Sequence, residues 1–505
     1  MRTTLNWHAA EQAAKSITDK WKANEPGGVI LGFDAAGVRF SVAGGLESLN
    51  GDVAFSSTSV GRFASVTKHF FCSLVLRHLD LISLDDRLGQ HLPQLQKPLA
   101  DVTVEQALSM TGGLPDNREC LTLVGLSVYS ETSSRGNLDM TARQTRLNFA
   151  PGTETSYSNT GYRLVEHILE KKGVYLKDFL EAEINKDLGT HFDAPHVWAD
   201  PVRGLVPGYW FNGQKWLQSA AGLQISAAGS VTASVTDMSL WLRTLMAGEG
   251  KWLGILDQLA TSRTLNDGTR TGYGLGMTDT ILGDRTFIGH GGSHPGYKSY
   301  IMMDRDNGLG LIFLSNREDT DARGSVSKVM ATLHDLALPK PSADRLPDGL
   351  YVADSGSLWL EIEGETATWL SDSGVLYEQG ENEVSTRSST SQLNLKREGD
   401  RLVGKIGFAD CALSPVGHVD VPASLDGLWY NEEGAFVTIK NGTLTMGAGP
   451  NRKDMALRAL GNGRYLFTLI DSLWTKRVCL NQLDEGRFEL VTSRARMMEY
   501  CRVKP

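Results

Sequence analysis

The chain has 505 residues but few cysteines and no excess of basic residues. Its five cysteines are odd in number and scattered, and no C-x-x-C pair occurs, which argues against a disulfide framework and against a zinc or redox motif. Fifty basic residues against 59 acidic ones give a formal charge of −9, the wrong sign for a protein that neutralises phosphates. We therefore expect free thiols in the cytoplasm and no nucleic-acid partner.

Long apolar runs are also missing. No segment approaches the ~18 uninterrupted apolar residues of a membrane helix, and the N-terminus lacks the apolar core of a signal peptide. We expect no membrane partner, although a chain whose signal had been removed would read the same way. Hydrophobic residues make up 41% of the chain and charged residues 22%, which is enough apolar material for several packed cores. We therefore expect no long disordered segments.

The first two thirds of the chain show mixed helix and strand patterns. Residues 27–45 alternate short apolar runs with Gly and Asp, which predicts a hairpin. Apolar spacing predicts one long buried helix over 64–84. Further helices are expected over 104–110, 162–171 and 325–336, and strands near 300–303 and 308–315. Because strands flank the helices at both ends, we predict one α+β domain, residues 1–338, whose sheet both ends complete.

Three prolines within residues 339–347 mark a linker, and short alternating strands follow it. Residues 346–351 resemble residues 424–429, and this repeat favours two small antiparallel β-barrels, 348–417 and 418–505, over one β domain. The tryptophans of this half are expected in barrel cores rather than on a carbohydrate platform: Trp359, Trp369, Trp429 and Trp474.

The motif S-x-x-K occurs twice, at Ser65 to Lys68 and at Ser325 to Lys328, as chance alone allows in a chain of this length. The first copy opens the long apolar helix, where positions i and i+3 face the same way and backbone N–H groups are unpaired. A buried, un-ionised lysine there can draw the serine proton. The second copy reads as a helix start with a solvated lysine.

Two further motifs follow Ser65 in the chain. In the first, Tyr157 beside a lysine can act as a base and Asn159 can orient a substrate carbonyl. The second begins at His290, and its glycines at a strand edge let a substrate approach and offer an N–H to an oxyanion. Taken alone, the two motifs read as a helix cap and a glycine-rich turn.

The order of the three motifs resembles the penicillin-recognising serine hydrolases, which carry S-x-x-K, Y-x-N and K-T-G or H-x-G. That family includes class C β-lactamases, D,D-peptidases and esterases. The resemblance covers most of residues 27–336 and implies an antiparallel sheet flanked by helices, an acyl-enzyme, and no metal or organic cofactor. Supporting similarities lie at residues 103–115, 149–152, 221–223 and 273–277.

This resemblance also implies roles for single residues. Ser65 is the expected nucleophile, and Lys68 and Tyr157 handle its proton, with the choice of general base left open. His290 stands in the place of the family's third-motif lysine, and the N–H groups of Ser65 and of a residue near Ser293 hold the oxyanion. The expected substrate-binding residues are Asn159, His290, Gly291, Gly292 and Ser293.

The His-Gly-Gly form of the third motif, followed by two barrels, resembles bacterial members of the family that release N-terminal D-amino acids. In those members a loop of the last barrel enters the active site, and an aspartate there reads the amino group. Asp471, in the matching but shorter region 469–476, is the candidate. Other interpretations stay open: an esterase or D,D-carboxypeptidase-like hydrolase, or a binding protein on a retained scaffold. The expected partner is a small molecule or short peptide, and a homodimer is compatible with the sequence.

Overall fold

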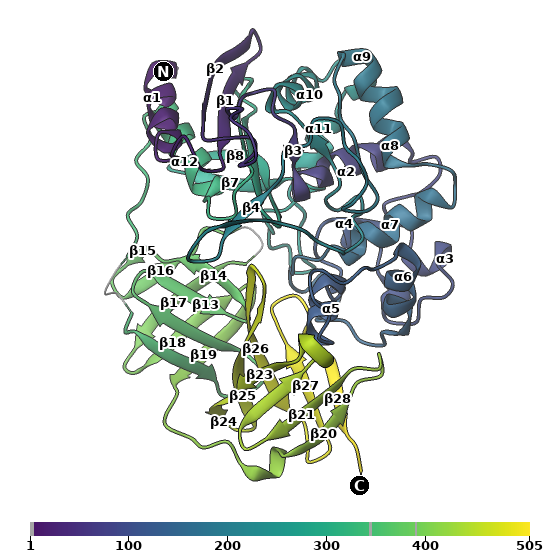
Figure 1. Cartoon of the computed structure of the whole chain (residues 1–505), viewed down its shortest axis with the longest axis vertical. Coiled ribbons are helices and arrows are strands. Elements are labelled where there is room, and N and C mark those ends of the chain that lie inside the picture. The colour runs from purple at the N-terminus through teal and green to yellow at the C-terminus, as the bar shows by residue number, and fades with distance from the viewer. Residues whose placement is uncertain (1–4, 343–345, 389–390, 505) are drawn as a thin grey trace.

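The computed structural model describes residues 5–342, 346–388 and 391–504. Its N-terminal unit, residues 5–342, contains a six-stranded antiparallel sheet in the order β2-β1-β10-β9-β8-β7 (Figure 1). Strand β1 pairs with β10 from Gly28 opposite Ser315 to Asp34 opposite Leu309. Both ends of the unit therefore complete the sheet, and the predicted α+β arrangement is confirmed.

The helices of the N-terminal unit are α1 Trp7–Thr18, α2 Thr67–Arg77, α3 Leu88–His91, α4 Val104–Leu108, α5 Asn117–Leu123, α6 Ser134–Arg143, α7 Thr160–Glu170, α8 Leu176–Phe179, α9 Lys186–Leu188, α10 Val235–Ala247, α11 Ile255–Ala260 and α12 Ala322–Leu333. Its strands are β1 Gly28–Asp34, β2 Gly37–Gly44, β3 Gly61–Arg62, β4 Tyr209–Phe211, β5 Trp216–Gln218, β6 Thr232–Ala233, β7 Thr278–Leu282, β8 Arg285–His294, β9 Tyr297–Asp304 and β10 Leu309–Ser315.

Helices cover both faces of this sheet. The terminal helices α1 and α12 pack on each other and on one face, where they close a separate apolar cluster (Figure 1). Helices α2 and α10 belong to the larger cluster on the other face. Among the described residues, no helix has the length and apolarity that a bilayer crossing requires.

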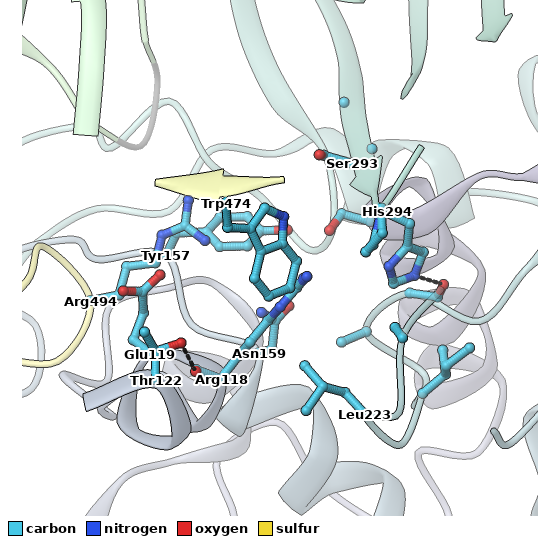
Figure 2. A pocket seen from close by; sticks show the side chains of 18 of the residues that line it. Arg118, Glu119, Thr122, Tyr157, Asn159, Leu223, Ser293, His294, Trp474 and Arg494 are labelled. Carbon is cyan, nitrogen blue, oxygen red and sulfur yellow. Dashed lines mark hydrogen bonds between the residues drawn. The ribbon is translucent and has the colours of Figure 1, made fainter. Parts of the chain in front are cut away.

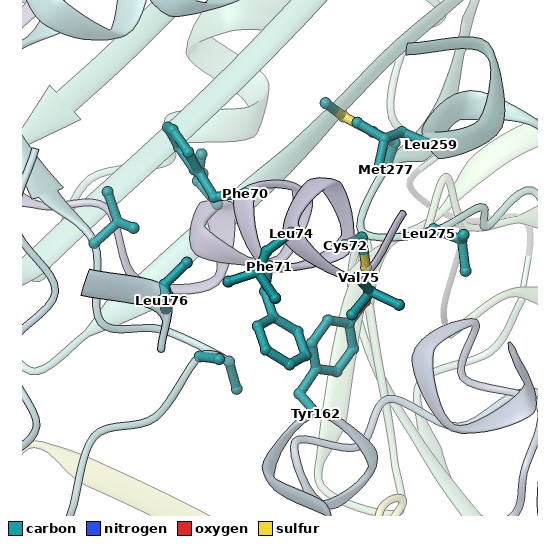
Figure 3. Packing of buried hydrophobic residues seen from close by; sticks show 14 of the residues in the cluster. Phe70, Phe71, Cys72, Leu74, Val75, Tyr162, Leu176, Leu259, Leu275 and Met277 are labelled. Atoms are coloured by element: carbon teal, nitrogen blue, oxygen red, sulfur yellow. Dashed lines mark hydrogen bonds between the residues drawn. The ribbon is translucent and has the colours of Figure 1, made fainter. Parts of the chain in front are cut away.

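Helix α2 is the centre of the larger core (Figure 3). Its residues from Thr67 to Leu76 are all buried, as expected for a helix packed on every side. The predicted extent of residues 64–84 is wrong at both ends: Ala64–Val66 form a 3₁₀ turn, and the α-helix stops at Arg77. The apolar spacing continues through Leu79, but that side chain is 44% exposed in a turn.

The chain after residue 346 forms two nearly closed nine-stranded antiparallel barrels with the same strand order. The strands of the first barrel are β11 Gly349–Ala353, β12 Trp359–Glu363, β13 Thr366–Trp369, β14 Asp372–Val375, β15 Tyr377–Gly380, β16 Glu383–Ser385, β17 Leu393–Glu398, β18 Arg401–Ile406 and β19 Ala409–Pro415. Those of the second barrel are β20 Gly427–Tyr430, β21 Phe436–Lys440, β22 Thr443–Met446, β23 Lys453–Ala456, β24 Arg458–Gly461, β25 Arg464–Asp471, β26 Trp474–Gln482, β27 Arg487–Val491 and β28 Met498–Arg502. The prediction of two barrels is confirmed, and a boundary at 339–347 stays a prediction because residues 343–345 lie outside the described residues.

The second barrel packs directly on helix α5 (Figure 1). Its apolar core continues into Cys120, Leu121 and Leu123 of that helix. The hydroxyl of Tyr500 on β28 donates a 2.8 Å hydrogen bond to the Leu123 carbonyl. This contact fixes the second barrel against the N-terminal unit through both apolar burial and a buried hydrogen bond.

Candidate active site

Ser65 follows a residue in a strained backbone conformation. Ala64 has a φ of 49°, in the left-handed region that residues with a side chain rarely adopt. The carbonyl of Phe63 accepts a 2.7 Å hydrogen bond from Ser299 Oγ, which holds the segment in place. Strand β8 passes so near that a Cβ on Gly292 would lie 2.0 Å from the same carbonyl oxygen. The glycine is therefore required for the close approach that brings β8 beside Ser65.

Lys68 is fully buried one turn after Ser65. Its Nζ lies 2.9 Å from Asn159 Oδ1, 2.7 Å from the Ala228 carbonyl oxygen and 3.3 Å from Ser65 Oγ. Burial lowers the pKa of Lys68 well below its usual value. A neutral amine has two N–H groups and one lone pair. In the neutral amine, the two carbonyl oxygens can accept both N–H groups, which leaves the lone pair for the Ser65 hydroxyl.

Asp116 holds Asn159 in the orientation that this arrangement needs. Its Oδ2 accepts hydrogen bonds from the Asn159 backbone N–H at 2.7 Å and from Nδ2 at 2.9 Å. Its Oδ1 accepts from the Glu119 backbone N–H at 3.1 Å, which caps helix α5. Asn159 Oδ1 is thereby directed to Lys68, and among the described residues the second N–H of Nδ2 has no acceptor.

Tyr157 packs between Lys68 and the second barrel. The Lys68 Nζ is 4.9 Å from the Tyr157 ring centroid, and the Arg494 guanidinium carbon is 4.8 Å from it. Burial raises the pKa of Tyr157 to about 12, although a hydrogen bond with Ser65 and the charge of Arg494 act in the opposite direction. The phenol is therefore protonated near neutral pH and suited to donate a proton.

His290 carries no charge near neutral pH. Burial lowers the pKa of His290 to about 3. Its Nδ1 lies 2.6 Å from the Gly291 carbonyl oxygen, which can only accept, so Nδ1 carries the proton. Its Nε2 then accepts from the Tyr273 hydroxyl at 3.1 Å. The third motif therefore brings a neutral ring, not a cation, to the site.

A cavity of about 840 Å³ lies beside these side chains. Ser65 and Tyr157 line it, together with the predicted substrate-binding residues Asn159, His290, Gly291, Gly292 and Ser293 (Figure 2). The two barrels also contribute to its wall: the first through Ser371, Asp372, Ser373 and Ser388, the second through Leu473, Trp474, Thr475, Lys476 and Arg494. The volume suits a small molecule or a short peptide.

Asp471 does not belong to this lining. Its carboxylate accepts hydrogen bonds from Ser127 Oγ at 2.8 Å, from the Val128 backbone N–H at 2.5 Å and from Lys453 Nζ at 2.9 Å. These contacts fasten the tip of the β25–β26 hairpin to the N-terminal unit. The structure therefore does not bring the proposed amine-binding aspartate to the site.

Sequence reasoning missed three cavity residues from the helix α5 and second-barrel surfaces. Trp474 was expected in a barrel core, but its ring lines the cavity, so that prediction is wrong. The Arg118 guanidinium carbon lies 3.9 Å from the Trp474 ring centroid (Figure 2). Arg118 and Arg494 stand in no motif, and only the contact between α5 and the second barrel brings them together.

The second S-x-x-K copy, Ser325 to Lys328, does not belong to the lining of this cavity. Ser325 is inside helix α12, and Lys328 Nζ lies 3.3 Å from Ser16 Oγ on an exposed surface. Within the described parts of the chain, no group of three or more His, Cys, Asp and Glu side chains is placed to hold a metal ion.

The family model named Beta-lactamase matches residues 13–333. The chain therefore belongs to the Beta-lactamase family, and the resemblance drawn from the three motifs is confirmed. It is 25% identical over 420 residues to the D-aminopeptidase of Brucella anthropi, a match that covers 78% of this chain and 76% of that protein.

Two solved structures share the fold. The octameric penicillin-binding protein homologue from Pyrococcus abyssi matches with a TM-score of 0.55 and 17% identity, covering 94% of this chain and 96% of that one. The D-amino acid amidase from Ochrobactrum anthropi SV3 matches with a TM-score of 0.54 and 20% identity, covering 65% of this chain and 99% of that one. The Pyrococcus match extends over the barrels, whereas the amidase match covers 65% of this chain.

Proposed function

We propose that the protein is a serine hydrolase that forms an acyl-enzyme and releases N-terminal D-amino acids from peptides, amides or esters. The observation that carries this proposal is the buried Lys68 amine, which lies 3.3 Å from Ser65 Oγ and within hydrogen-bond distance of two other acceptors, Asn159 Oδ1 and the Ala228 carbonyl oxygen. The names of the relatives, D-aminopeptidase and D-amino acid amidase, support the D-amino acid as the acyl group.

In acylation, the neutral Lys68 accepts the Ser65 proton as Oγ attacks the substrate carbonyl. The resulting oxyanion binds the backbone N–H groups of Ser65 and of Ser293 on β8. When the C–N bond breaks, the Tyr157 phenol gives its proton to the departing amine, and the Lys68 ammonium nearby restores it. Lys68 is thus the general base of this scheme, and Tyr157 is the general acid.

In deacylation, water replaces the departed amine beside Tyr157. Lys68 again receives a proton as water attacks the ester carbon, and Ser65 Oγ recovers its proton when the ester bond breaks. Asn159 Nδ2 offers its free N–H to the acyl part of the substrate.

The nucleophile is tested by mass spectrometry after treatment with a fluorophosphonate. We expect one covalent adduct on the wild-type protein, no adduct on Ser65→Ala, and an unchanged adduct on the control Ser325→Ala. An adduct that survives Ser65→Ala would contradict the mechanism.

The substrate class is tested with D-alanine p-nitroanilide, its L-enantiomer and its N-acetylated form. We expect turnover of the D-compound with a free amine, and at least about tenfold slower turnover of the other two, since a missing specific contact costs about 1.4 kcal/mol or more. Equal rates with the acetylated compound would favour the esterase or D,D-carboxypeptidase-like alternative. We also propose that the protein works in the cytoplasm, and that its oligomeric state, a homodimer or a larger assembly, can be measured by light scattering.

A further inference from the structure

Two arginines line the cavity, and in the described parts of the chain neither is hydrogen-bonded to a carboxylate. Arg118 lies in the first turn of helix α5, and Arg494 lies in the connection between β27 and β28. Over the residues that the structure describes, neither guanidinium donates a hydrogen bond or forms an ion pair with a carboxylate. Their contacts are aromatic: Arg118 with Trp474 at 3.9 Å and Arg494 with Tyr157 at 4.8 Å (Figure 2).

The carboxylates around these arginines already have other partners. Asp116 accepts three hydrogen bonds from Asn159 and from the start of α5. Glu119 Oε1 accepts a 2.7 Å hydrogen bond from Lys476 Nζ. Asp372, from the first barrel, accepts a 2.7 Å hydrogen bond from Ser391 Oγ. The N–H donors of the two guanidinium groups can therefore form hydrogen bonds with a ligand.

The two cations line one cavity, and carboxylates lie near both of them. Burial lowers the pKa of Arg118 to about 10, the charges of Asp116 and Glu119 act in the opposite direction, and the charge of Arg494 lowers this pKa further. Burial also acts to lower the pKa of Arg494, but the charges of nearby carboxylates, Asp372 foremost, hold it above its ordinary value. A further carboxylate beside the two guanidinium groups would be attracted by both of them in this partly desolvated space. Planar guanidinium groups match the two oxygens of a carboxylate.

Hydrogen bonds to its backbone carbonyl hold Arg494 at the reaction centre. The Asp116 N–H donates a 2.8 Å hydrogen bond to the Arg494 carbonyl, and Asn148 Nδ2 donates another at 2.9 Å. Asp116 therefore links the second barrel to the amide of Asn159. Because Arg494 lies against Tyr157, the proposed proton donor to the departing amine, its guanidinium faces the leaving group rather than the acyl group.

We propose that Arg118 and Arg494 bind a carboxylate on the leaving group of the substrate. The preferred substrates are then short D-peptides with a free C-terminus, not amino acid amides. This assignment rests on the proposed function, since it takes Tyr157 as the residue that protonates the leaving group. The second barrel thereby contributes a specificity-determining residue to the site.

The test compares hydrolysis of D-Ala-D-Ala with that of D-Ala-D-Ala-NH₂, which lacks only the terminal charge. We expect the wild-type kcat/KM to favour the free acid at least about tenfold, as for one desolvated charge pair. Arg494→Gln and Arg118→Gln should each bring this ratio close to one. The control Arg496→Gln, in the same connection but paired with Glu154 at 3.0 Å, should keep the wild-type ratio.

Other outcomes would overturn the assignment. Equal wild-type rates for acid and amide, or an unchanged ratio in both glutamine variants, would exclude carboxylate binding by this pair. Selective hydrolysis of D-Glu-NH₂ over D-Gln-NH₂ would place the anion on the acyl side. No turnover of any of these compounds would contradict the proposed function itself.

Binding to the Ser65→Ala protein, measured by calorimetry, applies the same comparison without turnover. We expect D-Ala-D-Ala to bind at least about tenfold more tightly than its amide. Equal affinities would again exclude the carboxylate site.

Discussion

The two barrels share one strand order but differ in how they meet the rest of the chain. Strands β16 and β17 of the first barrel have 3 and 6 residues, whereas their counterparts β25 and β26 have 8 and 9. The longer hairpin brings Trp474 and Lys476 to the cavity wall. The core of the second barrel continues into helix α5, while the main core of the first barrel contains only its own residues and Leu346.

The same strand order therefore forms both barrels, whereas the length of the β25–β26 hairpin determines how far the second barrel extends into the cavity wall. A longer antiparallel hairpin satisfies its backbone hydrogen bonds within itself, so lengthening it disturbs the rest of the sheet little. The added residues can then carry side chains to a distant site. Two copies of one fold thus serve the same enzyme differently.

The largest expected effect is a loss of kcat, and it comes from the N-terminal unit rather than from either barrel. Lys68→Met should lower kcat by about 10²- to 10⁴-fold, the usual contribution of general acid–base catalysis, because neither barrel supplies another described base at Ser65. The control Lys328→Met, from the second S-x-x-K copy, should leave kcat unchanged. Steady-state kinetics measures both, and a loss below tenfold for Lys68→Met would place the base elsewhere.

The next effect compares two fully buried leucines, one in each barrel. Leu395→Ala in the first barrel and Leu444→Ala in the second should each lower the free energy of unfolding by about 2 to 5 kcal/mol. Leu444 lies in the core shared with helix α5, so its loss should also lower the temperature at which activity is lost. Leu395→Ala should lower only the temperature of the calorimetric transition in which the first barrel unfolds, and not the temperature at which activity is lost. Identical behaviour of both variants would contradict the proposed difference in coupling.

Much of the fold and the centre of the site could be predicted from sequence because their signals are local. Ser65, Lys68 and Tyr157 stand in short motifs, and the barrel repeat shows in its turn residues. The end of helix α2 was missed because Leu79 keeps the apolar spacing while lying in a turn. Arg118 and Arg494 were missed because only tertiary packing brings them to one cavity.

An intermediate effect concerns an ion pair in each barrel. Lys476 of the second barrel pairs with Glu119 of helix α5, which is 5% exposed. Lys476→Met should lower the free energy of unfolding by about 1 to 3 kcal/mol, because it leaves a buried carboxylate without its partner. The loss is limited because the lysine itself is partly solvated. Arg401→Met, which removes the exposed pair with Asp354 in the first barrel, should cost less than about 0.5 kcal/mol. Urea unfolding measures the loss of unfolding free energy in both variants. Equal losses would show that the pair between the second barrel and helix α5 stabilises the protein no more than the exposed pair does.

The smallest expected effect is a shift of the pH profile, and it again distinguishes the barrels. Activity requires neutral Lys68, so the rate should fall as the pH drops through the pKa of that amine, while Tyr157, with a pKa of about 12, adds no alkaline limb near neutrality. Burial is the main cause of the low pKa of Lys68, Asp116 opposes it and Arg494 lowers the pKa further.

Arg494→Gln removes a neighbouring cation, so the pKa of Lys68 rises and the acid limb of kcat moves to higher pH. Asp116→Asn removes an anion and should move the same limb to lower pH. Arg401→Gln in the first barrel should leave it in place. These profiles are measured with a p-nitroanilide, which has no carboxylate, so the shift reports on Lys68 rather than on leaving-group binding. An unchanged limb in Arg494→Gln would mean that the second barrel contributes contacts to the cavity but no electrostatic field at the base.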